Sequence, residues 1–313
     1  MNLIIHHWDT DGICSASLIL EVVDNTENIT LLPGIFKFDE RVWNAVNRAE
    51  KVYVVDVNLP KEVERIEKPV VFLDHHIQNK IEKKNVIHVN PIFEGKQAPS
   101  ASYVVSSFFS HWDWRSALGA VGDVGRRAFR FDWVLKILKK YELSEKEALR
   151  LAELINSPSL LFDRRGVEEA VEKVANNDPK YLLEDDEWNK NVGRIEQEIT
   201  RILKNVHENS KFSLAKFSSD YNIASIIARK LVWDSNSEVA IVVNENYHGF
   251  SQLYVRVKED RANLYKIEEL IKKLKSKNLN AGGKKDVLGV IFEREKLGEV
   301  VKVIENHFGE SLW

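Results

Sequence analysis

The chain has 313 residues, of which 44% are hydrophobic and 30% are charged, and its formal net charge is −3 at pH 7. This length predicts two globular domains, and the charge excludes a polycation that binds nucleic acid indiscriminately. The single cysteine, Cys14, excludes an internal disulfide. Since no apolar run reaches the roughly 18 residues of a membrane span and no secretory signal is expected, we expect a cytoplasmic protein.

Apolar strands and helical stretches alternate over the first hundred residues. The predicted strands are residues 3–6, 29–32, 51–56, 69–73 and 86–89. Helices are predicted over residues 13–23, over 39–49 with Asp39 as the cap, and from Pro60 onward. The strands are apolar on both faces, as in parallel sheets that carry helices on each side. The pattern therefore predicts an α/β fold with a parallel sheet for this part of the chain.

From Ala101 onward the pattern becomes mainly helical. Helices are predicted over residues 102–109, 114–121, 131–140, 145–156 and 167–175, and Ser144 with Glu147 forms a capping-box signature. A long polar helix from Glu187 to about Glu208 is predicted to join two domains. Beyond it, strands are predicted at 212–217, 238–243, 250–257 and 287–292, and helices at 223–231, 264–274 and 297–308. We expect domains at 1–186 and 210–313, with a linker helix at 187–209 and a smaller α+β fold in the second domain.

A cluster of ligand-type side chains follows the first predicted strand. His7, Asp9 and Asp11 are spaced by two residues, so an extended segment would point all three the same way. Two carboxylates and an imidazole converging there would repel one another unless a cation lay between them. A mixed nitrogen and oxygen donor set suits Mn²⁺ or Mg²⁺. Taken alone, the cluster could equally be a capped helix start with a hydrogen-bonded histidine.

Three further clusters lie where predicted strands or helices end. Asp56 ends the third strand, Asp74-His75-His76 ends the fourth, and Asp123 lies between glycines at the end of an apolar helix. An aspartate at a strand end is usually a turn former. Parallel strands, however, bring their carboxyl ends to one edge, where open α/β sheets bind ligands. Four clusters at that edge predict a site.

The set His7-x-Asp9-x-Asp11-Gly12, Asp56, Asp74-His75-His76 and Gly122-Asp123 resembles, in order and spacing, the DHH phosphoesterase superfamily. That superfamily includes RecJ-type exonucleases, nanoRNase-type oligoribonucleases, family II inorganic pyrophosphatases and cyclic-dinucleotide phosphodiesterases. The resemblance extends to the second domain, where Gly282-Gly283-Lys284-x-x-Val287-Leu288-Gly289 has the spacing of the glycine-rich motif of DHHA1 domains. It implies a DHH catalytic domain at 1–186 and a DHHA1 substrate-binding domain at 210–313.

The resemblance implies a site for two Mn²⁺ ions, with Mg²⁺ as the other candidate. One ion would be held by His7, Asp9 and Asp56, and the second by Asp11, Asp56, His75 and Asp123, with Asp56 bridging. The candidate catalytic residues are Asp74, His75 and His76. Two cations about 3.5–4 Å apart can ionise a bridging water and neutralise the phosphate oxygens on which charge builds.

The candidate substrate-binding residues are Arg256, Gly282, Gly283, Lys284, Ser102 and Arg127. Each has a structural alternative: a strand-turn glycine pair, a solvated strand arginine, a helix-cap pairing for Arg127, and a capped helix start at Ser100 beside Ser102. Lys284 stands where the family usually carries histidine, and a lysine binds phosphate as a point charge but cannot stack or shuttle a proton in the same way. Among the tryptophans, Trp8 has a positional argument for base stacking, and the others, Trp233 included, are expected mostly in the core.

The resemblance implies a Mn²⁺-dependent exonuclease that hydrolyses single-stranded nucleic acid, with DNA favoured and 3′→5′ polarity, in DNA repair or replication. The similarity is greatest to compact archaeal DHH nucleases that associate with a helicase. Expected partners are single-stranded nucleic acid, a repair helicase or replication factor, and a second copy of the chain, but not a membrane. The alternatives are a short-oligonucleotide hydrolase or 3′-phosphoadenosine-5′-phosphate phosphatase, and a non-catalytic DHH scaffold.

Overall fold

The computed structural model describes residues 1–32, 37–209, 211–234 and 237–311. The chain divides into two compact units, Met1–Val192 and Gly193–Trp313, and the boundary falls within helix α10 (Asp186–Leu203). This helix is shorter than the predicted one, because His207–Glu208 pair antiparallel with the next strand as β6. The domain boundaries at 186 and 210 stay a prediction.

A five-stranded parallel sheet forms the centre of the first unit. Its strands are β1 (Asn2–His6), β2 (Thr26–Thr30), β3 (Lys51–Val55), β4 (Val70–Leu73) and β5 (Val86–Val89). Their order is β2-β1-β3-β4-β5, and all the pairings are parallel. The predicted α/β fold is therefore confirmed. In this order the chain switches direction between β1 and β3, which is where doubly wound sheets bind their ligands.

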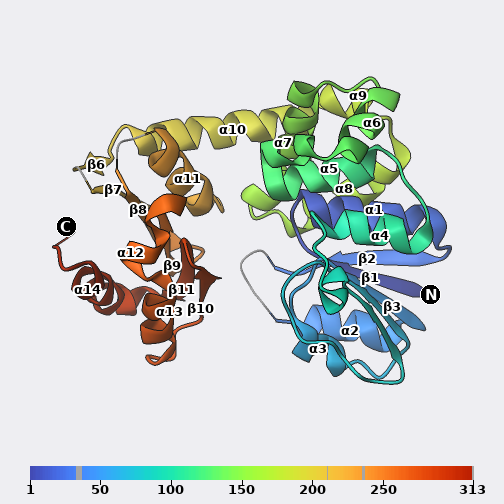
Figure 1. The fold of residues 1–313 in the computed structure, drawn as a ribbon, viewed down its shortest axis with the longest axis horizontal. Coiled ribbons are helices and arrows are strands. Elements are labelled where there is room, and N and C mark those ends of the chain that lie inside the picture. Colours follow the sequence, from blue (N-terminus) through green and yellow to red (C-terminus); the bar gives the residue numbers. More distant parts are fainter. Residues whose placement is uncertain (33–36, 210, 235–236, 312–313) are drawn as a thin grey trace. The chain divides into compact units, whose positions relative to one another are not determined.

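Helices cover both faces of this sheet (Figure 1). On one face lie α1 (Thr10–Val22) and α4 (Ala101–Phe109), and on the other α2 (Glu40–Arg48) and α3 (Pro60–Glu64). Because both faces are covered, the strand side chains Leu3, Ile4, Ile5 and Phe72 are all fully buried. This explains why the middle of β1 and all of β4 are apolar at consecutive positions rather than at alternate ones.

Further helices extend the face that carries α1. They are α5 (Trp114–Val124), α6 (Asp132–Lys140), α7 (Glu145–Leu160), α8 (Arg164–Asn176) and α9 (Pro179–Leu183), with short 3-10 turns at Pro91–Glu94 and Gly125–Arg130. The capping box of Ser144 and Glu147 is present at the start of α7. Helix α7 continues through Pro158 and ends at Leu160, four residues beyond its predicted end. Helix α9 was not predicted, because its five residues show too little periodicity.

The second unit contains a six-stranded mixed sheet in the order β10-β11-β9-β8-β7-β6. Its longer strands are β7 (Phe212–Phe217), β8 (Val239–Tyr247), β9 (Phe250–Val257), β10 (Ala281–Lys284) and β11 (Val287–Glu293). Its helices are α11 (Ala224–Asp234), α12 (Ala262–Tyr265), α13 (Ile267–Lys275) and α14 (Leu297–Phe308), with 3-10 turns at Glu259–Arg261 and Arg294–Lys296. The single helix predicted over 264–274 is divided at Lys266, which has a φ of 48°.

The two faces of this second sheet are covered by different helices. Leu253 and Val255 of β9 share a buried cluster with Leu270 of α13 and Val300 of α14. Helix α11 contacts β8 and β9. Within the described residues, no helix of either unit is long and apolar enough to cross a membrane.

Strand β5 contributes a buried histidine to the first unit. The ring of His88, 8% exposed, stacks on Phe72 with 4.3 Å between ring centroids, and its Nδ1 accepts a hydrogen bond of 3.1 Å from the backbone N–H of Ile81. Burial lowers the pKa of His88 from 6.5 to about 4. The neutral ring is therefore the form that the fold accepts.

We predict that His88 destabilises the first unit in acid. Its folded pKa lies below its unfolded pKa, so its contribution is complete above pH 6.5 and declines as the pH falls towards 4. Between pH 7.5 and pH 5 the loss should be about 2 kcal/mol. The measurement is urea unfolding followed by tryptophan fluorescence, in the wild type and in His88→Gln.

The difference between the two proteins isolates His88, because the other titrating groups are common to both. A variant of the exposed His207, His207→Gln, serves as the control and should keep the pH dependence of the wild type. An identical pH dependence in His88→Gln and in the wild type would contradict the assignment.

Candidate metal centre

The loops after β1, β3 and β4 meet at the carboxyl edge of the first sheet. His7 follows β1, Asp56 follows β3 and Asp74 follows β4. Asp56 has a φ of 58°, in the left-handed region that few residues other than glycine adopt. This conformation costs roughly 1–2 kcal/mol. Asp56 also lies between two groups of ligand-type atoms, so the strain occurs at the centre of the site.

The first group consists of His7, Asp9 and Asp56, whose ligand atoms lie within 4.8 Å of one another. The Nδ1 atom of His7 is 2.9 Å from Oδ2 of Asp9 and 3.8 Å from Oδ2 of Asp56. Asp9 also caps α1, because its Oδ1 accepts a hydrogen bond of 3.0 Å from the backbone N–H of Gly12. A Cβ at Gly12 would collide with the carbonyl of His7, so only glycine lets α1 start this close to the end of β1.

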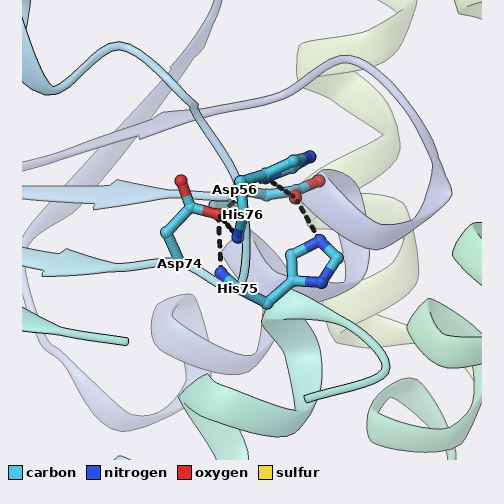
Figure 2. A group of neighbouring side chains, drawn as sticks. All are labelled: Asp56, Asp74, His75 and His76. Carbon is cyan, nitrogen blue, oxygen red and sulfur yellow. Dashed lines mark hydrogen bonds and ion pairs between the residues drawn. The ribbon is translucent and has the colours of Figure 1, made fainter. Parts of the chain in front are cut away.

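The second group contains Asp56, Asp74, His75 and His76 (Figure 2). The Nε2 atom of His75 is 3.5 Å from Oδ1 of Asp56. Asp74 accepts hydrogen bonds from the backbone N–H groups of His75 and His76, at 2.7 and 3.1 Å, and from Nδ1 of His76 at 2.8 Å. Its other oxygen accepts a hydrogen bond of 2.8 Å from Nε2 of Gln78. Asp74 thus positions the two histidines by holding their loop.

Asp11 lies at the amino end of α4, where helix N–H groups favour an anion. Its two oxygens accept hydrogen bonds of 2.6 and 3.0 Å from the backbone N–H groups of Ala101 and Ser102. A Cβ at Gly119 of α5 would collide with the Asp11 carboxylate and with the Ser102 hydroxyl. Asp123, one turn further along α5, is exposed, and neither Asp11 nor Asp123 belongs to the two groups described above.

The electrostatics of the site indicate that its negative charge needs compensation. Burial raises the pKa of Asp56 well above its usual value, and repulsion from Asp11, Asp9, Asp74 and Asp123 adds to the effect. Burial also raises the pKa of Asp11 to about 6, against the attraction of His75 and with repulsion from Asp123. Asp123 therefore acts on both Asp56 and Asp11 through its charge.

Two neighbouring pairs behave differently. Burial alone would raise the pKa of Asp9, but the charge of His7 and the hydrogen bonds hold it well below its ordinary value. In the same way, burial disfavours a charged His76, but the hydrogen bond to Asp74 and the charge of that carboxylate raise the pKa of His76. His76 is therefore protonated more readily than an ordinary histidine, at an edge that carries several carboxylates.

The donor atoms fit divalent cations. The Nε2 atom of His75 is buried and makes no hydrogen bond within the described part of the chain, although it faces Asp56. The buried Nδ1 atom of His7 lies beside carboxylate oxygens of Asp9 and Asp56. Buried polar atoms without a partner are rare and call for an unseen ligand or ion. Imidazole and carboxylate donors around a shared aspartate suit Mn²⁺ or Mg²⁺. The donor set can therefore hold metal.

The predicted substrate-binding residues differ in burial and lie in both units of the chain. The Ser102 side chain is fully buried and donates 3.1 Å to the carbonyl of Ser116, and Ser100 caps α4. Arg127 is exposed on the turn after α5. In the second unit, Gly282, Gly283 and Lys284 form strand β10, and Arg256 lies on β9. The glycine pair thus belongs to a strand rather than to a loop.

Two polar residues of the site were not predicted. Gln78 holds Asp74, and Asn90 donates a hydrogen bond of 2.8 Å from Nδ2 to the carbonyl of His76. Asn90 directly follows β5, as Asp74 follows β4, so the strand-end rule could have identified it. For Gln78, in a loop without regular structure, the sequence contains no comparable signal.

Residues 2–121 match the family model described as DHH family, N-terminal domain. No curated protein matches the chain in sequence. Among solved structures, a DHH-domain protein described as a member of a family of ribosomal proteins is similar, with a TM-score of 0.73 and 16% identity over 98% of this chain and 86% of that one.

Two RecJ structures are also similar. RecJ from Thermus thermophilus in complex with Mn²⁺ has a TM-score of 0.68 at 16% identity, over 98% of this chain and 52% of that one. This chain thus spans about half the length of the Thermus protein. An exonuclease RecJ bound to manganese has a TM-score of 0.64 at 15% identity, over 98% of this chain and 90% of that one.

The structural likenesses establish the fold, a parallel-sheet unit followed by a mixed-sheet unit. Taken with the match over residues 2–121, they show that the first unit carries a DHH-family domain.

We predict that Asp56→Asn abolishes most of the stabilisation by Mn²⁺. At an ion concentration 100 times the dissociation constant, binding should stabilise the wild type by about 2.7 kcal/mol. The variant should show little of this gain, because both groups of donors lose a charged oxygen. Thermal unfolding with and without Mn²⁺ measures the difference, and the exposed Asp24→Asn is the matched control.

The same experiment without metal tests the electrostatic account. The raised pKa of Asp56 means that its ionised form is disfavoured in the fold at neutral pH, so removing the charge should stabilise the metal-free protein. A metal-free Asp56→Asn protein that unfolds at a lower temperature than the wild type would contradict this reasoning.

Proposed function

We propose that the protein is a Mn²⁺-dependent exonuclease that hydrolyses phosphodiester bonds of single-stranded nucleic acid, with DNA favoured and 3′→5′ polarity, in DNA repair or replication. The observation that carries the proposal is the convergence of two buried imidazole nitrogens on Asp56: Nδ1 of His7 is 3.8 Å from Oδ2 and Nε2 of His75 is 3.5 Å from Oδ1. The manganese in the two RecJ structures supports the choice of ion.

Two groups of donors that share one carboxylate suit a pair of cations. His7, Asp9 and Asp56 would hold one ion, and Asp56, His75, Asp11 and Asp123 the other. Each Asp11 oxygen already accepts one N–H, and a carboxylate oxygen retains a second lone pair for an ion. When bound, such a pair supplies an ionised water and neutralises the phosphate oxygens.

The protein's own residues position these donors and the substrate. Asp74 fixes His75 and His76 through four hydrogen bonds to their loop. His76 is bound through Nδ1, which leaves its Nε2 to face a phosphate oxygen, and its raised pKa favours the charged ring for that contact. Orientation and positive charge are what phosphodiester cleavage requires of the protein.

A repair helicase or replication factor that produces unpaired strands is the proposed partner, and a second copy of the chain is a further one. The basis for both is the family resemblance. The short-oligonucleotide hydrolase and the non-catalytic scaffold remain the competing functions, and the two experiments below separate them from the exonuclease.

The first experiment tests catalysis. With Mn²⁺, the wild type should degrade a labelled single strand, and Asp11→Ala should lower the rate at least about 100-fold by removing a metal donor. Asp74→Ala should lower it about 10–100-fold, because the aspartate only positions His75 and His76. Asp24→Asn should keep the wild-type rate.

Strands that bind to the wild type but are never cut, at any Mn²⁺ concentration, would instead favour the scaffold. The binding measurement is made by fluorescence anisotropy on the same labelled strand.

The second experiment tests length and polarity. An exonuclease should degrade a 30-mer in single-nucleotide steps at a rate comparable to that of a 2–5-mer, and 3′→5′ polarity predicts a ladder from a 5′-labelled strand. Sequencing gels of DNA and RNA strands labelled at either end show the products. Hydrolysis confined to the 2–5-mers would establish the short-oligonucleotide hydrolase, and a ladder from the 3′-labelled strand would reverse the polarity.

A further inference from the structure

Trp233, on helix α11 of the second unit, was expected in the core but is 67% exposed. Helix α11 contacts β8 and β9 (Figure 1), and its buried side chains, such as Ile227 and Ala228, account for its packing. The Trp233 ring is therefore not needed to cover the sheet. The exposed indole face is therefore accessible to a ligand.

Two arginines flank this ring. Arg229, one turn earlier on α11, places its guanidinium carbon 5.7 Å from the ring centroid, and Arg256 of β9 places its own at 5.9 Å. Both distances lie near the outer limit for cation–π contact, about 6 Å. Although Arg229 is exposed as a whole, partial desolvation of its guanidinium and the charge of Arg256 lower its pKa. The positive charges of Arg229 and Arg256 therefore lie close together, and a bound anion would reduce the repulsion between them.

The neighbouring carboxylate compensates this charge only weakly. Asp286 is 3.9 Å from the Arg256 guanidinium, at the limit of an ion pair. The exposed Lys284 lies in the same cross-strand row as Arg256, because both are in register with Val287. Residues in register share a face of the sheet. The surface around Trp233 therefore has an excess of positive charge.

Two glycines of the sheet beside these cations, Gly282 and Gly289, carry no side chains. Gly282 and Gly289 are in register with each other and with Tyr254, so they share the face that carries Arg256. A Cβ at Gly282 would meet nothing within 4 Å, and a Cβ at Gly289 would meet the Tyr254 ring at 3.5 Å. The result is a strip of bare backbone bordered by Tyr254, the arginines and Lys284.

We propose that Trp233 stacks on a nucleobase of an unpaired strand, while Arg229 and Arg256 bind the adjoining phosphate. A flat exposed indole offers stacking to any base, and guanidinium groups bind phosphate through paired N–H donors. The inference rests on the proposed function and deepens it: the substrate must carry a base at this position, and its sequence is not read.

The test compares binding of a fluorescein-labelled oligo(dT) hexamer with that of an abasic strand of the same length, without divalent ions. Trp233→Ala should weaken oligo(dT) binding about 10-fold, the equivalent of 1.4 kcal/mol, and should leave abasic-strand binding unchanged. Trp233→Phe, the matched control, should keep most of the affinity. Arg229→Ala should weaken the binding of both strands and make it less dependent on salt.

Two results would overturn the inference: unchanged oligo(dT) affinity in Trp233→Ala, or an equal loss for both strands. Circular dichroism shows whether each variant folds. If Trp233→Ala does not fold, the binding measurements on Arg229→Ala still test the proposed site. Hydrolysis of bis(p-nitrophenyl) phosphate with Mn²⁺ reports on the metal centre separately, and the exposed-site control Asp24→Asn should keep the wild-type rate. A wild type that binds the hexamer but hydrolyses neither substrate would refute the proposed function and leave the stacking site standing.

Discussion

The repulsion among buried carboxylates at one edge of the first sheet is the constraint on which the site depends. Asp56 is 3% exposed and lies near Asp9, Asp11 and Asp74, and its raised pKa shows the cost of placing these charges together. A protein selected for stability alone would replace some of them. Cations between the carboxylates would turn the same arrangement from repulsive to attractive, which is the physical reason to assign it to metal chemistry.

The fold provides the precision that such a site requires. The donors come from loops that follow three neighbouring strands, and the strand order fixes the spacing of those loops. Local hydrogen bonds then set each side chain: Gly12 holds Asp9, the amino end of α4 holds Asp11, and Asp74 holds the two histidines. The donors are thus oriented before any ion binds.

Most of this arrangement could be predicted from the sequence. The central strands β1, β3 and β4 contain runs of consecutive apolar residues, and His7, Asp56 and Asp74 follow them, so both the fold and the residues at its edge follow from pattern and topology. The joint role of Asp56 in two groups was implied by family resemblance rather than by spacing. What could not be predicted depends on packing: Pro158 inside α7, the break at Lys266, the burial of Ser102 and the exposure of Trp233 are decided by neighbours distant in sequence.

The contact between α5 and the Asp11 carboxylate has a consequence for how this centre can fail. At Gly119 the helix backbone lies so close to Asp11 and Ser102 that a single methyl group has no space. Gly119, which is itself not a metal donor, therefore determines whether the Asp11 carboxylate can keep its position. A larger residue at position 119 would therefore disrupt the metal centre although all of the donor residues are still present.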